Sequence, residues 1–317
     1  RIPSVNPSLV PGGNGEADIA RFIGKLLDDM GLEVRYQELG ENRANVTGIL
    51  RGAGGGKSLM LNGHIDTVGP AGMSIHPFDP VYSDGKVLGR GSMDMKGGVA
   101  AMIGALLAIR QADVKLKGDV YLTFVADEEF ASIGTEAIVR EYKADAAIVC
   151  EPTGLSITAY HKGFVWLRVE VQGVAAHGSL PEEGVDAIVK AGQFLVELER
   201  LGKTALAQKR HPVLGSPSVH ASTIKGGVEL STYPASCVVE LERRLIPGED
   251  AGTAKEEIYR IIEDLSKKDP EFRATCEVLF HRPPFEASLG EAPVTTLQKA
   301  FRAALGSEPE IGSTAAW

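Results

Sequence analysis

Several residues that could bind a metal ion or move protons follow short apolar segments in the first half of the sequence. They are His64, Asp66, Glu128, Glu129 and Glu151. Because side chains alternate along a strand, His64 and Asp66 are expected to face the same side. Imidazole and carboxylate groups together could hold a divalent cation, and a neighbouring acid could serve as general base in a hydrolysis reaction.

A glycine-rich segment, residues 89–98, adds Asp94 and Lys96 directly before a predicted helix. Glycine permits tight turns and close approach of the backbone there. The spacing matches neither the P-loop nor the dinucleotide-binding fingerprint, so a nucleotide-binding enzyme is the weaker interpretation. Taken singly, each motif also fits a structural role: a histidine held by a neighbouring acid, or a solvated acidic turn at residues 127–129.

The acids are expected to converge, because the ligand crevice of an open α/β sheet lies at the carboxyl ends of its strands. Two carboxylates about 4 Å apart repel by about 4 kcal/mol at an effective dielectric near 20, and a bound cation removes that penalty. Mixed imidazole and carboxylate ligands favour zinc, cobalt or manganese over calcium. The pattern therefore predicts a metal site.

The elements that must position these residues alternate in type. Helical spacing is predicted over residues 17–30, 99–109 and 135–142, and strands over 58–62, 120–125 and 146–150. Such alternation indicates an α/β fold with a mainly parallel sheet.

From about residue 162 the order becomes βαββαβ, which is typical of a small antiparallel sheet covered by two helices. The predicted strands are 164–171, 218–228, 237–245 and 274–279, and the predicted helices are 185–201 and 251–265. We therefore expect an inserted, ferredoxin-like domain at residues 161–281. Residues 1–160 and 282–317 would form a discontinuous catalytic domain, to which a helix at 294–305 belongs.

The composition limits the possible partners. The 317 residues carry a net charge of −9 without a clustered Lys/Arg run, which argues against nucleic acid or an anionic membrane. No apolar stretch is long enough to span a membrane and no signal peptide opens the chain, so a cytoplasmic protein is expected. The three separated cysteines are predicted to be buried, reduced thiols. The first residue is not methionine, and we expect further segments at both ends.

The segments GHIDTV, GRGSMDMKGG, ADEE and CEPT, in this order and spacing, resemble one known family. It comprises the co-catalytic zinc deacylases and exopeptidases, including acetylornithine deacetylase, succinyl-diaminopimelate desuccinylase, aminoacylase and carboxypeptidase G. The resemblance covers nearly the whole chain. It implies two divalent ions, zinc first and cobalt or manganese as alternatives. His64 and Glu151 would bind one ion, Glu129 the other, and Asp94 would bridge both.

The resemblance also implies catalytic roles. Asp66 would orient His64, and Glu128 would act as general base on a metal-bridging water. The last metal ligand, a histidine near the family's C-terminus, is expected beyond this chain, since His281 falls at the predicted domain junction. The other histidines, His76, His161, His211 and His220, are expected to be structural or surface residues.

The resemblance also implies that the inserted domain acts as a lid and forms a homodimer interface. It places three residues of this domain near the substrate. His177 would reach the partner subunit's active site, and Arg244 would grip a substrate carboxylate. Ser231 replaces an asparagine common in related enzymes, which weakens any narrow substrate assignment. Arg243 is expected to be solvated.

The leading hypothesis is a deacylase that removes an acetyl or succinyl group from an N-acyl amino acid, because Glu151 at its position resembles the deacylase branches. A dipeptidase or carboxypeptidase of the same family, acting on a short peptide, is the alternative. A catalytically silent homologue that binds metal without hydrolysis is the third possibility, and the intact Glu128 argues against it.

Overall fold

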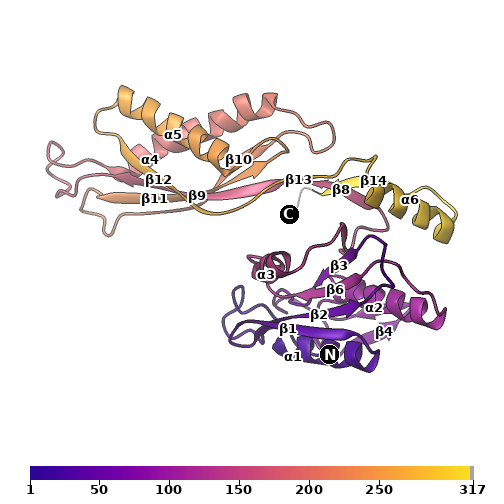
Figure 1. Cartoon of the computed structure of the whole chain (residues 1–317). Coiled ribbons are helices and arrows are strands. Elements are labelled where there is room, and N and C mark those ends of the chain that lie inside the picture. The colour runs from indigo at the N-terminus through magenta and orange to yellow at the C-terminus, as the bar shows by residue number, and fades with distance from the viewer. Residues whose placement is uncertain (315–317) are drawn as a thin grey trace. The chain divides into compact units, whose positions relative to one another are not determined.

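A computed structural model describes residues 1–314 of the chain and divides it into two compact units. The first unit comprises Arg1–Gly154 and the second begins at Leu155. Each unit has its own sheets and its own hydrophobic core (Figure 1).

The first unit is built on a mixed five-stranded sheet of order β1-β2-β6-β3-β7. Its strands are β1 (Glu33–Gly40), β2 (Arg43–Leu50), β3 (Leu59–His64), β6 (Val120–Val125) and β7 (Ala146–Val149). Strand β3 runs parallel to both β6 and β7, whereas β1 and β2 form an antiparallel hairpin and β2 is antiparallel to β6. A small separate hairpin joins β4 (Val81–Ser83) to β5 (Lys86–Leu88).

Helices cover both faces of this sheet. They are α1 (Ala17–Asp29), α2 (Lys96–Gln111) and α3 (Ile133–Glu141). Apolar residues of α1 and α2 share one core with β2 and β6, and Ile138 of α3 packs with Met60 and Val125 in another. Helix α1 buries its residues at helical spacing and is followed by Gly31 at φ 73°, a left-handed conformation that favours glycine at a helix end.

The second unit contains an antiparallel four-stranded sheet of order β10-β11-β9-β12. Its elements are β9 (Gly163–Gln172), α4 (Ala187–Leu201), the π-helical turn η1 (Gly202–Leu206), β10 (Ser218–Gly226), β11 (Ser236–Leu245), α5 (Ala251–Lys268) and β12 (Arg273–Arg282). Helices α4 and α5 lie along one face of the sheet (Figure 1) and share a core with β9 and β11. Asp186 and Asp250 cap the two helices by accepting backbone N–H groups of the first turn.

A second, three-stranded sheet of order β13-β8-β14 also belongs to this unit. It consists of β8 (Ile157–His161), β13 (Phe285–Glu286) and β14 (Ile311–Thr314), with α6 (Ala292–Leu305) between the last two in sequence. The assignment of residues 282–317 to a discontinuous catalytic domain, and of 161–281 to an inserted one, stays a prediction. The end of the former range lies outside the described residues.

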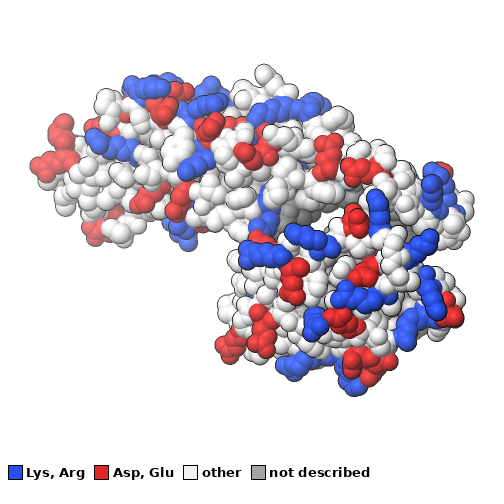
Figure 2. All heavy atoms as spheres, viewed as in Figure 1, with Lys and Arg blue, Asp and Glu red and all other residues white. Residues whose placement is uncertain are grey.

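The structure confirms the α/β class, and the predicted βαββαβ order is that of β9, α4, β10, β11, α5 and β12. All three cysteines are free, but Cys150 is half-buried rather than buried. Within residues 1–314, no helix is long and apolar enough to cross a membrane. Acidic and basic side chains are interspersed over the face shown in Figure 2, without a broad field of one sign.

Candidate metal centre

The predicted metal-binding residues come together in the first unit, at one edge of its sheet. His64 is the last residue of β3, Glu128 and Glu129 follow β6, and Glu151 follows β7. Because β3, β6 and β7 are mutually parallel, their carboxyl ends meet at the same edge. Asp94 reaches this edge from the loop directly before α2.

His64 lies at the centre of the group. Its Nε2 atom is 3.0 Å from Asp94 Oδ1, 3.6 Å from Glu151 Oε1 and 3.8 Å from Glu128 Oε2. Its other ring nitrogen, Nδ1, lies 3.0 Å from the carbonyl oxygen of Asp66 and 3.4 Å from that residue's Oδ1. A proton on Nδ1 suits these acceptors and leaves the Nε2 lone pair for a cation.

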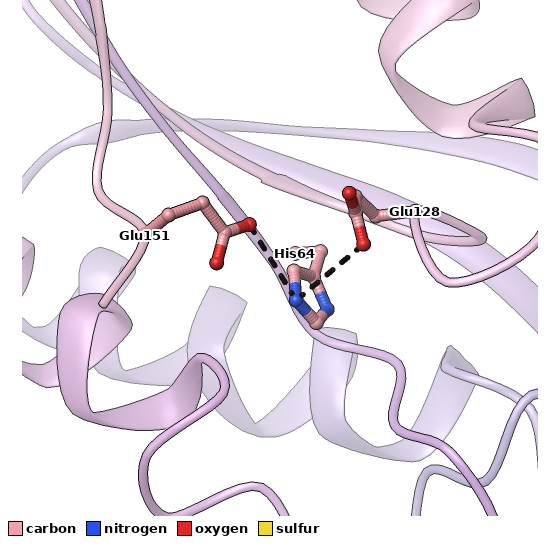
Figure 3. A group of neighbouring side chains, drawn as sticks. All are labelled: His64, Glu128 and Glu151. Carbon is pink, nitrogen blue, oxygen red and sulfur yellow. Dashed lines mark ion pairs between the residues drawn. The ribbon is translucent and has the colours of Figure 1, made fainter. Parts of the chain in front are cut away.

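Figure 3 shows Glu128 and Glu151 directing their carboxylates toward the imidazole of His64. The ligand atoms form two groups, His64 with Glu128 and Glu151, and His64 with Asp94 and Glu129. Within each group the atoms lie within 4.8 Å of one another. The imidazole is 1% exposed, while the side chains of Asp94, Glu128 and Glu151 are 31–51% exposed. The acids therefore line a site that solutes can reach.

Asp66 fixes the backbone that carries the two neighbouring glutamates. Its carboxylate is fully buried and accepts the backbone N–H of Glu128 at 3.1 Å and of Glu129 at 3.2 Å. The preceding residue, Asp127, has φ 68°, a left-handed conformation uncommon outside glycine. This bend lets adjacent glutamates take different places, Glu128 beside Glu151 and Glu129 beside Asp94.

The electrostatics of the group reflect crowded negative charge. Burial raises the pKa of Glu128 to about 8; the His64 charge opposes this shift, and the charge of Glu151 adds to it. Burial likewise raises the pKa of Glu151 to about 7, with the charge of Asp94 adding to the effect. Burial alone would lower the pKa of His64, but hydrogen bonds with Asp66 and Asp94 outweigh it and raise that pKa to about 11.

These donors fit divalent ions such as zinc. One imidazole and four carboxylates are the ligand types such ions take in hydrolytic sites. The raised pKa values of Glu128 and Glu151 mean that the protein itself does not neutralise these acids fully. A cation would supply the missing charge.

Close backbone contact sets part of the spacing. Gly98 in the first turn of α2 lies against the end of β7, where a Cβ atom would stand 2.1 Å from the carbonyl oxygen of Cys150. Only glycine permits this approach. The loop before α2, which carries Asp94, is thereby held next to the residue that precedes Glu151.

A buried polar cluster beneath the site was missed by the sequence analysis. Arg43 forms a two-point ion pair with Glu16 and a further pair with Asp127 at 2.9 Å. Asn6 donates to both Asp66 and Asp127. Asn6, Glu16 and Arg43 are far from the site in the sequence and match no motif, so only the tertiary structure identifies them.

The remaining predicted site residues belong to the second unit. His177 and Ser231 lie on adjacent segments, because the N–H of Gly178 donates to the carbonyl of Ser231 at 2.7 Å and His177 pairs with Thr232 in a β-bridge. His177 is exposed, and its Nδ1 lies 2.8 Å from Ser179 Oγ.

Arg244 lies on β11, on the sheet face opposite the helices. Its guanidinium pairs with Glu242 at 2.8 Å and lies over the ring of Phe164. Among the described residues, its buried Nη1 atom has no hydrogen-bond partner. An unsatisfied, buried guanidinium nitrogen is a costly feature that an incoming acceptor would relieve.

The prediction that Arg243 is solvated is wrong. Its side chain is 1% exposed and pairs with Glu249 at 2.7 Å and Glu257 at 2.9 Å. Alternation along β11 turns Arg243 toward the helices, where Glu257 of α5 meets it. Burial is tolerated because both partners are acids.

Known proteins resemble this chain in sequence. The family model for peptidase family M20/M25/M40 matches residues 60–317. An acetylornithine deacetylase from Myxococcus xanthus is 31% identical over 268 residues, which are 80% of this chain and 65% of that protein. The chain thus spans just under two thirds of the length of this relative.

Solved structures share the fold. The aminopeptidase PepT from Bacillus cereus superposes with a TM-score of 0.80 at 20% identity, over 100% of this chain and 82% of that one. The YXEP protein of Bacillus subtilis, described as a dinuclear metal binding peptidase of the M20 family, gives 0.71 at 15% identity, over 99% and 79%. From the sequence match over most of its length, the chain belongs to peptidase family M20/M25/M40.

Proposed function

We propose that this protein is a two-metal amidohydrolase that removes an acyl group from an N-acyl amino acid. The observation that carries the proposal is the group of four carboxylates and one imidazole at the carboxyl ends of β3, β6 and β7. Its candidate ligand atoms form two overlapping groups that share His64, and a relative in fold is described as a dinuclear metal binding peptidase. Zinc is the first expectation, with cobalt or manganese as alternatives.

Glu128 serves as the general base. It takes a proton from the attacking water and returns it to the nitrogen of the leaving amine, so that the amide bond breaks and a carboxylic acid and an amine form. Bound divalent ions would make the water more acidic and stabilise the negative charge of the tetrahedral intermediate.

The other residues of the first unit hold ligands in place. His64 and Glu151 would hold one ion, Glu129 would hold the other, and Asp94 would serve both. Asp94 Oδ1 lies 3.0 Å from His64 Nε2. Asp66 fixes the backbone of both glutamates and faces His64 Nδ1, which keeps Nε2 available as a ligand.

Residues of the second unit bind the substrate. The free Nη1 of Arg244 is suited to one oxygen of the substrate carboxylate, and Ser231 lies beside His177 on the adjoining segment. His177 acts on the partner subunit's active site, which requires a homodimer. Strand β10 is a sheet edge, and an edge offers unpaired backbone groups to a second copy. A cytoplasmic location remains a prediction.

The substrate class has one alternative. The relative from Myxococcus xanthus is named a deacetylase, which favours the deacylase, whereas similar folds include an aminopeptidase. A panel of N-acetyl amino acids, N-succinyl amino acids and dipeptides separates the two. Turnover of dipeptides alone would replace the deacylase by a peptidase.

The test of the mechanism combines metal analysis with this panel. We expect about two zinc, cobalt or manganese ions per chain, loss of hydrolysis on chelation, and recovery on adding metal. Hydrolysis that is indifferent to chelation would refute the metal mechanism. A metal-loaded protein that hydrolyses nothing in the panel would favour the silent homologue.

A further inference from the structure

An amide near the N-terminus lies between two buried carboxylates of the first unit. Asn6 is fully buried, and its Nδ2 donates to Asp66 Oδ2 at 2.8 Å and to Asp127 Oδ1 at 3.1 Å. The two hydrogens of one amide group thus serve two acids. An acceptor at this position would leave both carboxylates facing further negative charge.

The position of this amide is fixed from several sides. Its Oδ1 accepts the N–H of Ser8 at 2.9 Å and Arg43 Nη2 at 3.3 Å. The backbone around it pairs with the segment just after β3, because Asn6 N donates to Thr67 O at 2.9 Å and Thr67 N donates to Ser4 O at 3.0 Å. The N-terminal segment is therefore joined directly to the segment that follows His64.

Both acids held by Asn6 contact or form the turn that carries the general base, Asp66 through its carboxylate and Asp127 through its backbone. Asp66 accepts the N–H groups of Glu128 and Glu129. Asp127 is the left-handed residue immediately before them, and its carbonyl accepts the N–H of Ser132 and of Ala131. A shift of either acid would move the glutamates, and misplacement by about 1 Å can cost about 100-fold in rate.

We propose that Asn6 is a positioning residue, which locks Asp66 and Asp127 and thereby holds Glu128, Glu129 and His64 in the arrangement that binds metal. The inference rests on the proposed function for its catalytic consequence. Its structural part, the clamp on the Glu128 and Glu129 amides, can be measured without metal or substrate. None of the sequence motifs includes Asn6, and its distance from the site in sequence hides the role.

The first test compares Asn6→Ala with a matched control, Asn45→Ala, in the full-length protein. Asn45 is also a buried amide of the same unit, donating to Gln37 and to the Gly134 carbonyl and accepting the N–H of Ala126. Both variants lose several buried hydrogen bonds, so both are expected to lower the melting temperature. Only Asn6→Ala removes a donor from Asp66.

The readouts are amide-resolved hydrogen exchange of the metal-free protein and zinc affinity by chelator competition. Asn6→Ala should speed exchange at Glu128 and Glu129 and weaken zinc binding by about 10- to 100-fold, the usual cost of losing a group that orients a ligand. Asn45→Ala should speed exchange at Ala126 and leave zinc affinity within about twofold of wild type. Equal zinc affinities in the two variants, with unchanged exchange at Glu128 and Glu129, would overturn the proposal.

A second variant separates positioning from charge. Asn6→Asp keeps the shape of the side chain but turns a donor into an acceptor beside two acids. If only the local charge mattered, the added negative charge would tighten zinc binding, whereas positioning requires weaker binding than in wild type. Tighter binding would overturn the inference. Wild-type protein that binds no metal would refute the proposed function instead, and the exchange pattern would still decide the role of Asn6.

Discussion

Two groups of charged residues, one in each unit, use acids in opposite ways. In the second unit, Arg243 and Lys209 pair with Glu249 and Glu257, so two cations meet two anions. In the first unit, Asp66, Asp94, Glu128 and Glu151 all pair with the one imidazole of His64. The charges of the group in the second unit balance within the protein. The group in the first unit has an excess of negative charge that a cation from solution can balance. A balanced group supports the fold, and an unbalanced one marks a binding site.

The largest expected effect is on catalysis, from a substitution in the acidic group of the first unit. Glu128→Gln should lower kcat by about 10²- to 10⁴-fold, because the amide cannot accept the proton of the attacking water. Metal content should stay at the wild-type level, and the metal-free variant should be no less stable, since a repelled carboxylate has been removed. Glu38→Gln, an exposed acid of the same unit, is the control. Full activity of Glu128→Gln would remove this residue from the mechanism.

Metal binding should stabilise one unit selectively. All candidate ligands in the described chain lie in the first unit, so at a metal concentration about 1,000 times Kd its free energy of unfolding should rise by about 4 kcal/mol. Hydrogen exchange of peptides from residues 1–154 would measure this change. Peptides from β9 and β11 provide the comparison, and equal protection in both units would contradict the assignment of the metal site to the first.

Breaking the balanced group should cost stability rather than activity at the metals. Arg243→Leu leaves buried acids without their main partner and should lower the free energy of unfolding by about 3 to 5 kcal/mol. Arg168→Leu is the matched control, since Arg168 pairs with Glu240 and Glu277 but is 42% exposed, and its loss should cost at most about 1 kcal/mol. Urea unfolding followed by fluorescence of Trp166, on β9, measures both. Equal losses would show that burial does not distinguish the two networks.

The smallest expected effect concerns stability in the metal-free protein. The stability of the two units should change in opposite directions with pH. Burial raises the pKa of Glu128 to about 8 and of Glu151 to about 7, so the folded first unit holds protons that the unfolded chain releases above pH 4.5. Its stability should therefore fall as the pH rises from about 5 to 8, and the raised pKa of His64 acts in the same direction. Saturating metal should remove this slope.

The second unit should instead lose stability as the pH falls. Burial would raise the pKa of Glu249, but hydrogen bonds from Arg243 and Lys209 outweigh it and lower the pKa below its usual 4.5. Its contribution to stability is present above pH 4.5 and is lost as the pH falls below that value. Segment-resolved hydrogen exchange at a series of pH values checks both slopes. Parallel slopes in the two units would contradict the contrast between the groups.

The sequence was sufficient to predict that His64, Asp94 and the candidate glutamates gather at one edge of the sheet, because each ends or follows a strand, or precedes a helix, with a clear hydrophobic pattern. It was not sufficient for β2, in which Arg43, Asn45 and Thr47 are buried although all are polar. Their hydrogen bonds run to partners as distant in sequence as Glu16, Gly134 and Asp127, which no local pattern reveals. The antiparallel β1–β2 hairpin was missed for this reason.

Arg243 was predictable and was nevertheless predicted wrongly. Along β11 the buried positions alternate, with Cys237, Val239, Leu241 and Leu245 turned inward. The same period of two places Arg243 on the inner face. A buried arginine is stable where acids meet it, as Glu249 and Glu257 do here.

The contact between Gly98 and the Cys150 carbonyl means that the spacing of two ligand-bearing segments depends on the absence of a single methyl group. A Cβ atom would lie 2.1 Å from that oxygen, and this steric clash would push the start of α2 and the end of β7 apart. It would move Asp94 away from Glu151 without changing any ligand. Position 98 is therefore a place where one added methyl group would change the separation of two segments that carry candidate ligands, while leaving every candidate side chain intact.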